Sequence, residues 1–243
     1  ELVNYFIKGN IALTKVDEDY PDNKLSGAVF EVYSDTNGDG KLDKDDTLLG
    51  EMKELDGGVY QMSELRYGKY LVKETKAPTG FVLDENVYSV SVEENGKTYT
   101  VENKAGVGFI NAAQKGSLKI VKTSSDGKVE GFSFRVTGVD YDQTFKTDKN
   151  GEIVIEGLRI GDYTVSEVSD KASAGYILPA DKQATVKVDA TAIVQMHNEF
   201  RDTPKTGDDF NLGLWVSLAA LSVVGAGVLG FVGYKNRKKK KED

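Results

Sequence analysis

Three side chains with complementary reactivity, a lysine, a glutamate and an asparagine, occur twice in this sequence, each at the end of an apolar stripe. The two sets are Lys15, Glu74 and Asn111, and Lys122, Glu167 and Asn198. Alternate residues of a β-strand share one face, so each polar residue shares its face with the apolar residues of its stripe. We therefore expect all six to point toward a hydrophobic core or its edge, where an isolated charge is costly.

Covalent chemistry would remove the cost of burying these charges. Burial lowers the pKa of a lysine and raises the pKa of a glutamate, which favours a neutral amine beside a neutral acid. A neutral amine is a nucleophile, and the acid can polarise an asparagine carbonyl and carry protons while ammonia leaves. The product is a lysine–asparagine isopeptide bond. The alternative is three ordinary strand-end polar residues that form hydrogen bonds or stay solvated.

An internal repeat places each set in a domain of its own. Leu65–Glu74 matches Leu158–Glu167 without a gap, and such self-similarity indicates tandem units. Short runs rich in Val, Ile, Thr, Tyr and Phe, separated by Gly, Asn and Asp clusters, favour β-strands joined by turns. We predict an all-β fold of two tandem Ig-like β-sandwiches.

The spacing of the repeat sets the predicted domain boundaries. Asn4 precedes Gly9 by the same interval as Asn111 precedes Gly116. Residues 1–9 are therefore expected to be the last strand of a preceding, truncated repeat. The two predicted sandwiches are residues 10–113 and 114–203.

The first glutamate lies in a motif with a family resemblance. The motif is Tyr70-x3-Glu74-x2-Ala77-Pro78-x-Gly80-Phe81. It resembles the glutamate box of pilin domains of the collagen-adhesin B type (Cna-B), also called SpaA-like or prealbumin-like domains. The resemblance implies a prealbumin-like sandwich with a self-forming isopeptide bond. The implied bonds are Lys15–Asn111 with Glu74 as catalyst and Lys122–Asn198 with Glu167 as catalyst. In the second repeat the box is two residues longer and lacks the proline.

A twelve-residue loop in the first repeat has the oxygen-rich pattern of a Ca²⁺ site. The predicted ligands are Asp35, Asn37, Asp39, the Lys41 carbonyl, Asp43 and Asp46. Gly40 stands where such loops turn sharply. The flanking segments, Val29–Ser34 and Thr47–Met52, have strand character, so the loop resembles the calcium loops of B repeats in serine-aspartate adhesins. We expect a structural Ca²⁺ site; the alternative is a solvated acidic turn.

The segment Leu212–Tyr234 carries no charged residue and is followed by the basic run Lys235–Lys241. As a helix it would be roughly 34 Å long, enough to cross a bilayer. Basic residues remain cytoplasmic, so the long N-terminal part would lie outside the cell. We predict a single C-terminal transmembrane helix within residues 204–243; the alternative is a buried core helix.

A short motif before this apolar segment completes a three-part pattern. The motif is Thr203, Pro204, Lys205, Thr206 and Gly207. Together with the apolar span and the basic tail it resembles the LPXTG-type sorting signal read by sortases, with Thr203 where leucine is usual. The resemblance implies sortase cleavage after Thr206. That residue would then be joined to a peptidoglycan precursor or to a lysine of another pilin subunit.

Composition excludes several classes of function. The sequence has no cysteine and a single histidine, His197, which excludes disulfides, thiolate or histidine-based zinc sites and catalytic triads. The net charge of −8 argues against nucleic-acid binding. The acidic stretch Asp17–Asp22 is expected to be a solvated loop.

These expectations combine into one functional hypothesis with two alternatives. The chain is expected to be a cell-wall-anchored adhesin or pilus-associated subunit on the surface of a Gram-positive bacterium, with a cytoplasmic tail before sortase cleavage. Its stapled domains would form a rigid, tension-resistant stalk, with no enzymatic activity beyond forming its own bonds. The alternatives are direct binding of host matrix or another pilin, or display of an enzyme domain N-terminal to this sequence.

Overall fold

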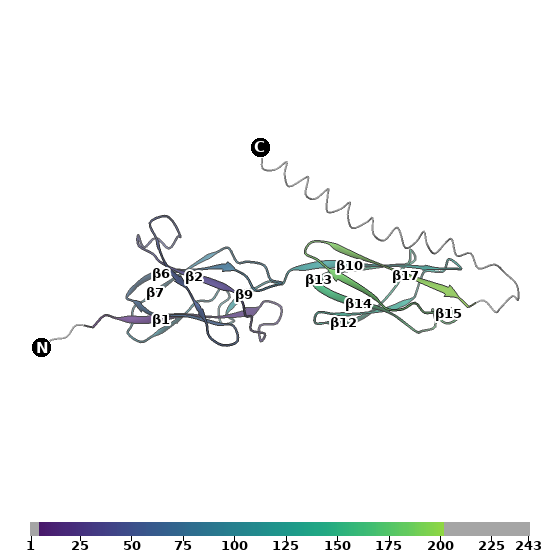
Figure 1. Cartoon of the computed structure of the whole chain (residues 1–243), viewed down its shortest axis with the longest axis horizontal. Helices are drawn as coiled ribbons and strands as arrows, with labels where there is room; N and C mark the ends of the chain where they lie inside the picture. Colours follow the sequence, from purple (N-terminus) through teal and green to yellow (C-terminus); the bar gives the residue numbers. More distant parts are fainter. Residues whose placement is uncertain (1–4, 202–243) are drawn as a thin grey trace, which may run out of the picture. The chain divides into compact units, whose positions relative to one another are not determined.

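The computed structural model describes residues 5–201, and Figure 1 shows this part as strands arranged in two sandwiches. Within those residues there is no helix, and hence none that is long and apolar enough to cross a membrane. The prediction of an all-β fold with two tandem sandwiches is confirmed. The predicted transmembrane helix at Leu212–Tyr234 lies outside the described residues.

The first sandwich contains two sheets. Its strands are β1 (Lys8–Asp17), β2 (Val29–Ser34), β3 (Thr47–Glu51), β4 (Lys53–Glu54), β5 (Val59–Arg66), β6 (Gly68–Lys76), β7 (Val87–Val92), β8 (Thr98–Thr100) and β9 (Phe109–Asn111). One sheet has the order β4-β5-β1-β8, with β9 also paired to β1. The other has the order β3-β2-β6-β7. The strands predicted on either side of the acidic loop are confirmed as β2 and β3.

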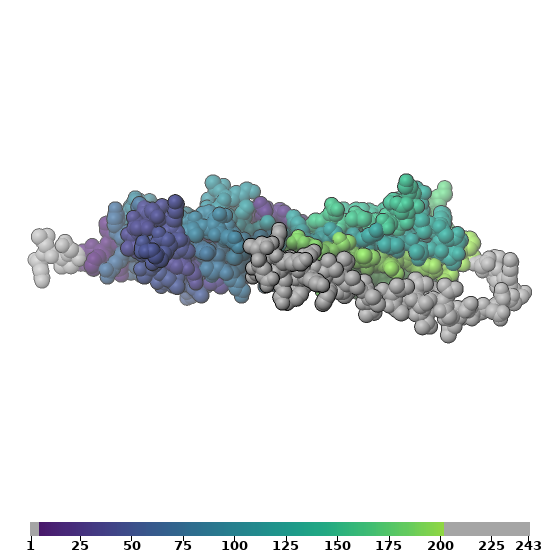
Figure 2. All heavy atoms as spheres, turned by 90° about the horizontal axis from the view of Figure 1, so that it is seen from above, coloured from purple at the N-terminus to yellow at the C-terminus, as the bar shows by residue number. Residues whose placement is uncertain are grey.

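The second sandwich repeats this plan. Its strands are β10 (Lys115–Ser124), β11 (Ser133–Gly138), β12 (Tyr141–Lys146), β13 (Glu152–Arg159), β14 (Gly161–Val168), β15 (Tyr176–Ile177), β16 (Lys182–Val186) and β17 (Thr191–Phe200). The sheets have the orders β13-β10-β17-β15 and β12-β11-β14-β16. Figure 2 shows that the colours of the two sandwiches do not mix, because each is built from one continuous stretch of chain.

Period-two burial along the strands explains why each sheet has an inner face. In β1, Ile11, Leu13 and Lys15 are buried, whereas the residues between them are partly exposed. The inner faces enclose an aromatic cluster in which the rings of Phe30 and Phe109 meet edge to face, with centroids 4.9 Å apart. A fully buried apolar side chain of this kind contributes roughly 1.5–3 kcal/mol to folding. The sheets therefore bury whatever polar residue shares the apolar face.

The first and last strands of each sandwich lie side by side and run parallel. In the β1–β9 pair Lys15 stands opposite Phe109, and in the β10–β17 pair Lys122 stands opposite Met196. In both pairs the asparagine follows two residues later, on the same face of the last strand. The glutamates come from β6 and β14, which belong to the opposite sheets. The fold thus brings all three residue types toward one point in each sandwich.

The start of the first sandwich differs slightly from the prediction. Strand β1 begins at Lys8, which pairs with Arg66, and Gly9 pairs with Leu65. Lys8 and Gly9 therefore belong to the first sandwich, whereas the repeat spacing assigned residues 1–9 to a preceding unit. The physical reason is that β1 already pairs with β5 at Lys8, whereas the alternation of apolar residues that identifies this strand in the sequence begins only at Ile11.

Candidate isopeptide sites

The first lysine, glutamate and asparagine meet inside the first sandwich. Lys15 and Glu74 are 0% exposed and Asn111 is 3% exposed. The Lys15 Nζ lies 4.0 Å from Glu74 Oε1 and donates a 3.0 Å hydrogen bond to the carbonyl of Phe109. The Asn111 Nδ2 donates to both carboxylate oxygens of Glu74, at 2.9 Å each. The glutamate therefore stands between the amine and the amide that would react.

A loop after β6 fixes the orientation of this glutamate. The backbone N–H of Asp84 donates a 2.9 Å hydrogen bond to Glu74 Oε2. The Asp84 side chain is itself held, because it accepts hydrogen bonds from the Tyr88 hydroxyl and from Asn103. On the other side, the Lys15 Nζ lies 5.3 Å from the centre of the Phe109 ring. The carboxylate and the amine are thus both positioned before any bond forms.

Burial shifts both titratable groups toward their neutral forms. It lowers the pKa of Lys15 to about 8, although the carboxylates of Glu74, Asp84 and Asp17 act in the other direction. Burial also raises the pKa of Glu74, against the hydrogen bonds from the Asp84 N–H and the Asn111 amide and against the charge of Lys15. A lysine amine with a pKa near 8 is partly neutral at physiological pH, as a nucleophile must be.

In the second sandwich the asparagine and the glutamate meet at the corresponding place, whereas within residues 5–201 no hydrogen bond or ion pair joins the Lys122 Nζ to either of them. Lys122 is 1% exposed and Asn198 is 0% exposed, whereas Glu167 is only partly buried. The Asn198 Nδ2 donates a 2.6 Å hydrogen bond to Glu167 Oε1. The Lys122 Nζ donates to the carbonyl of Thr123 and lies 4.2 Å from the centre of the Phe132 ring. The burial of Lys122 and Asn198 rules out a solvated strand end here, as burial does for the first set.

The pKa shifts at the second site have the same directions as those at the first. Burial lowers the pKa of Lys122, with the carboxylates of Glu167 and Asp126 acting against it. Burial raises the pKa of Glu167, opposed by the hydrogen bond from Asn198 and by the charge of Lys122. Both sandwiches therefore hold an amine and an acid that the interior drives toward neutrality.

Three buried oxygens at these sites have no hydrogen-bond partner among the described residues. They are Asn111 Oδ1, Asn198 Oδ1 and Glu167 Oε2. Leaving a buried acceptor unsatisfied costs about 1–3 kcal/mol. Rotation of the asparagine amide would turn its Oδ1 toward the glutamate, and a protonated glutamate can donate to that oxygen. Such a hydrogen bond polarises the carbonyl that the lysine would attack.

Both sandwiches match one family model. The SpaA domain model, described as a prealbumin-like fold domain, matches residues 9–105 and 116–200. This chain belongs to the SpaA prealbumin-like domain family. The second matched stretch contains the whole second set, whereas the first ends before β9 and therefore contains Lys15 and Glu74 but not Asn111. A search of curated proteins finds no significant match.

Three solved structures illustrate what this chain is similar to. The TIE protein of Bacillus anthracis is 25% identical with a TM-score of 0.59, over 80% of this chain and 34% of that chain. The pilus adhesin SpaC of Lactobacillus rhamnosus GG is 14% identical with a TM-score of 0.48, over 80% of this chain and 31% of that chain. The minor pilin GBS52 of Streptococcus agalactiae is 17% identical with a TM-score of 0.36, over 83% of this chain and 100% of that chain. The likeness to the TIE protein supports the arrangement of SpaA-type sandwiches, and this chain spans about a third of that protein.

The acidic loop of the first SpaA-type domain curls around one carboxylate. The two oxygens of Asp35 accept backbone hydrogen bonds from Gly38 at 2.7 Å and from Gly40 at 3.1 Å. Gly40 has a φ of +76°, which provides the sharp turn that a side chain would strain. The Asn37 amide donates to Asp43 Oδ2 at 3.2 Å. The oxygen donors suit a hard cation, but within residues 5–201 no three acidic or histidine side chains gather closely enough to hold a metal.

The predicted sorting motif at residues 203–207 lies outside the described residues.

The prediction for Asp17 was wrong: this residue, assigned to a solvated loop, is 2% exposed. Both of its carboxylate oxygens accept hydrogen bonds from Arg159 of the second SpaA-type domain. The sequence carries no local signal of this contact, because the two residues are far apart in the chain and each is ordinary in its own strand.

Proposed function

We propose that this chain is a pilus-associated or cell-wall-anchored surface subunit of a Gram-positive bacterium, and that its two SpaA-type domains form a stalk stapled by isopeptide bonds. The observation that carries the proposal is the recurrence in both sandwiches of a buried lysine on the first strand and a buried asparagine on the adjacent last strand, with a glutamate of the opposite sheet hydrogen-bonded to the asparagine. The bonds are Lys15–Asn111 and Lys122–Asn198.

The bond-forming step balances without a cofactor. The neutral Nζ of Lys15 attacks the side-chain carbonyl carbon of Asn111, while Glu74 donates a hydrogen bond to the amide oxygen. Glu74 gives its proton to that oxygen as the C–N bond forms, and the resulting carboxylate takes a proton from the attacking nitrogen. It passes this proton to Nδ2, which leaves as ammonia, and recovers its own proton from the hydroxyl group as the carbonyl re-forms. The product amide is neutral, so the interior no longer holds a potential charge on lysine. Glu167 has the same role for Lys122 and Asn198.

The position of the bonds suits a structure under tension. Force applied along the chain enters each sandwich through its first strand and leaves through its last. In both domains the proposed bond joins these two strands where they are already neighbours. The force would then pass through covalent bonds, and the hydrogen-bonded sheets between them would carry little of it.

Anchoring is the second part of the proposal and rests on the sequence alone. The apolar segment would hold the chain in the membrane until a sortase cleaves after Thr206. The new carboxyl group of Thr206 would then be joined to a peptidoglycan precursor or to a lysine of another pilin subunit. Substitution of Pro204 by alanine is expected to leave the protein in the membrane fraction of the expressing cell. Normal release of that variant into the wall fraction would contradict this assignment.

Intact mass is the decisive test of the bonds. The chain ending at Thr206 should be lighter than its sequence mass by two ammonia molecules after full denaturation. The Glu74→Ala and Glu167→Ala variants should each regain the mass of one ammonia, and a Glu51→Ala control on the exposed face of β3 should regain none. A full sequence mass for the unaltered protein would refute the proposed staples.

We also propose that Ca²⁺ orders the loop of the first domain, through Asp35, Asn37, Asp39, the Lys41 carbonyl, Asp43 and Asp46. The support is the set of oxygen donors on one tight loop and its turn at Gly40. The ion would supply rigidity there by drawing these oxygens together. Calorimetric titration with Ca²⁺ should show binding that Asp35→Asn weakens, and the absence of heat would leave a simple acidic turn.

A further inference from the structure

The junction between the two sandwiches contains a nearly buried ion pair. Arg159 Nη1 and Nη2 donate to the two carboxylate oxygens of Asp17, at 2.7 and 2.8 Å. The side chains are 14% and 2% exposed. A guanidinium that meets a carboxylate through two parallel hydrogen bonds fixes direction as well as distance. This pair therefore defines how the acidic end of the first sandwich meets the second.

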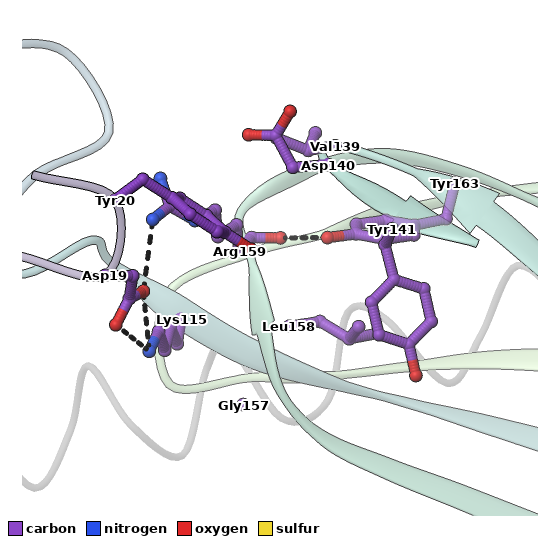
Figure 3. A pocket seen from close by; sticks show the side chains of 10 residues that line it. All are labelled: Asp19, Tyr20, Lys115, Val139, Asp140, Tyr141, Gly157, Leu158, Arg159 and Tyr163. Atoms are coloured by element: carbon purple, nitrogen blue, oxygen red, sulfur yellow. Dashed lines mark hydrogen bonds and ion pairs between the residues drawn. The ribbon is translucent and has the colours of Figure 1, made fainter. Parts of the chain in front are cut away.

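Further contacts surround this pair. Figure 3 shows Asp19 reaching both Lys115 and Arg159, and Asp19 Oδ2 lies 3.1 Å from the Lys115 Nζ and 3.1 Å from the Arg159 Nη2. The Arg159 guanidinium also lies over the ring of Tyr20, 4.9 Å from its centre, and 5.8 Å from the centre of the Phe81 ring. The first sandwich thus contributes two carboxylates and two aromatic rings, and the second contributes two cations.

The receiving end of the second sandwich has a close counterpart in the first. Lys115 pairs with Arg159 at the start of β10, and Lys8 pairs with Arg66 at the start of β1. In both sandwiches a tyrosine hydroxyl donates to the carbonyl of this arginine, from Tyr163 at 2.9 Å and from Tyr70 at 2.6 Å. The same backbone bond follows the arginine, from Ile160 N–H to Gln114 and from Tyr67 N–H to Ile7.

The counterpart surface on the first sandwich is open. Phe6 is 67% exposed and Tyr67 is 65% exposed, although both are large hydrophobic residues. Arg66 is exposed and stacks against Phe6, with its guanidinium carbon 4.4 Å from the ring centre. Within residues 5–201 no carboxylate lies at ion-pair distance from Arg66. We call Phe6, Lys8, Arg66 and Tyr67 the receiving surface.

Within residues 5–201, the far end of the second sandwich has no aspartate at the position that Asp17 occupies in the first. Ser124 occupies the position two residues after Lys122, where the first sandwich has Asp17 after Lys15. Asp126 is exposed, but its two carboxylate oxygens accept hydrogen bonds within its own sandwich, from the hydroxyl groups of Tyr176 and Ser124. The first sandwich therefore has both a receiving surface and an aspartate two residues after its lysine, whereas the described part of the second sandwich has a serine at that position.

We propose that the receiving surface of the first sandwich is an interaction surface for the acidic end of another SpaA-type sandwich, with Arg66 pairing with an aspartate two residues after the cross-link lysine of that partner. The support is charge complementarity and the equivalence with the junction already formed by Arg159. The inference extends the proposed stalk function, but it depends neither on the isopeptide bonds nor on sortase anchoring.

The first experiment uses the chain as it is. Burial alone would raise the pKa of Asp17, but hydrogen bonds from Arg159 and from the Asp19 N–H hold it below its usual range. Carboxyl NMR titration should show this low pKa, which Arg159→Gln should return toward the ordinary value. The matched variant Arg66→Gln should leave it unchanged.

The second experiment gives the receiving surface its proposed partner. A copy of residues 8–111 is placed before Tyr5, so that Asn111 of the copy takes the place of Asn4. The pKa of the copy's Asp17 should then lie below its usual range, like that of the native Asp17. Arg66→Gln in the original sandwich, not in the copy, should return the pKa of the copy's Asp17 to its ordinary value. The native Asp17, still paired with Arg159 in the same molecule, reports that the chain is folded.

Two results would overturn the proposal. One is an ordinary pKa for the copy's Asp17 while the native Asp17 remains low. The other is a low pKa that Arg66→Gln does not change, because the acid would then be held by other groups. If Arg66→Gln prevents folding, a double variant is used instead, in which the two charges are exchanged: Arg66→Asp in the original sandwich and Asp17→Arg in the copy. The exchange should restore a rigid junction by residual dipolar couplings, and a freely moving copy would contradict the assignment.

Discussion

The two candidate isopeptide sites contain the same three residue types but differ in how firmly the glutamate is held. Glu74 is fully buried and accepts hydrogen bonds on both oxygens, from Asn111 and from the Asp84 N–H. Glu167 is partly exposed and accepts one bond, from Asn198, while its Oε2 has no partner among the described residues. The difference shows that the reacting residues alone do not define the site, because the loop after the glutamate strand decides its orientation.

One residue in that loop accounts for the difference. The bridge between Phe81 and Ala113 in the first sandwich corresponds to the pairing of Tyr176 with Phe200 in the second. Three residues after Phe81 stands Asp84, whose N–H holds the glutamate, and three residues after Tyr176 stands Pro179. Proline has no N–H to donate. The second glutamate therefore lacks the hydrogen bond that completes the first.

The largest expected effect comes from removing each catalyst. Glu74→Gln should prevent the first bond and destabilise the first sandwich by about 4.7 kcal/mol, the value for closing a loop of roughly 100 residues if the disulfide model applies. Glu167→Gln should act similarly on the second. Differential scanning calorimetry should show one transition lowered in each variant, with Glu51→Gln as control. If the second transition were unchanged in Glu167→Gln, the second sandwich would have no bond to lose, and only the first sandwich would be cross-linked.

The pH dependence of bond formation should come next in size. The pKa of Lys15 is lowered to about 8, so its amine is increasingly protonated as the pH falls below that value. Formation of the first bond should slow roughly tenfold for each pH unit below 8, because only the neutral amine attacks. Mass spectrometry of samples quenched after refolding at different pH values would measure the rate. A rate that is constant between pH 5 and 8 would refute attack by a titrating amine.

The two bonds should form at different rates at a single pH. A missing hydrogen bond to a charged or polarised group is worth about 1.5 kcal/mol, or roughly tenfold in rate. The first bond should therefore form about ten times faster than the second after refolding. Digestion and mass spectrometry at successive times would follow each cross-linked peptide separately. Equal rates would mean that the Asp84 N–H contributes nothing to the reaction.

The smallest effects should come from exchanging the loop residues. Asp84→Pro should slow the first bond about fivefold, and Pro179→Asp should accelerate the second by a similar factor, if each change removes or supplies about 1 kcal/mol of the roughly 1.5 kcal/mol assigned to this hydrogen bond. Asp84→Ala is the control for the side chain, because it keeps the N–H. Faster formation of the second bond in Pro179→Asp would be the stronger result, because it would show that supplying the missing N–H improves the second site. No change in either rate would assign the difference to burial instead.

Much of the fold was predictable from periodicity. The alternation of Ile11, Leu13 and Lys15 indicated a strand with an inner face, and the repeat of Leu65–Glu74 at Leu158–Glu167 indicated two similar domains. The same alternation predicted that the lysines, glutamates and asparagines point inward. The structure was needed to show that β1 and β9 are parallel neighbours, because the sequence does not reveal which strands pair or in which register.

The contacts that depend on loops were not predictable. Asp84 has a backbone N–H and Pro179 has none. This difference matters only because the loop folds back so that the N–H at this position can donate a hydrogen bond to the glutamate. Asp17 appeared to belong to a solvated acidic stretch because its partner, Arg159, belongs to the next domain. Neither decisive neighbour carries a periodic signal, because Asp84 lies in a loop after the glutamate strand and Arg159 lies in the other domain. The calcium loop, by contrast, is a local pattern whose occupancy stays a prediction.

The adjacency of the first and last strands has a consequence for proteolysis. Exposed loops between the strands, such as Asp35–Asp46, are the segments that a peptidase attacks first. A bond between Lys15 and Asn111 would close a covalent ring that contains each loop of the first sandwich. A single cut would open that ring but would not separate the segments that precede and follow it. The subunit would stay continuous from end to end in a protease-rich environment, even after its loops had been nicked.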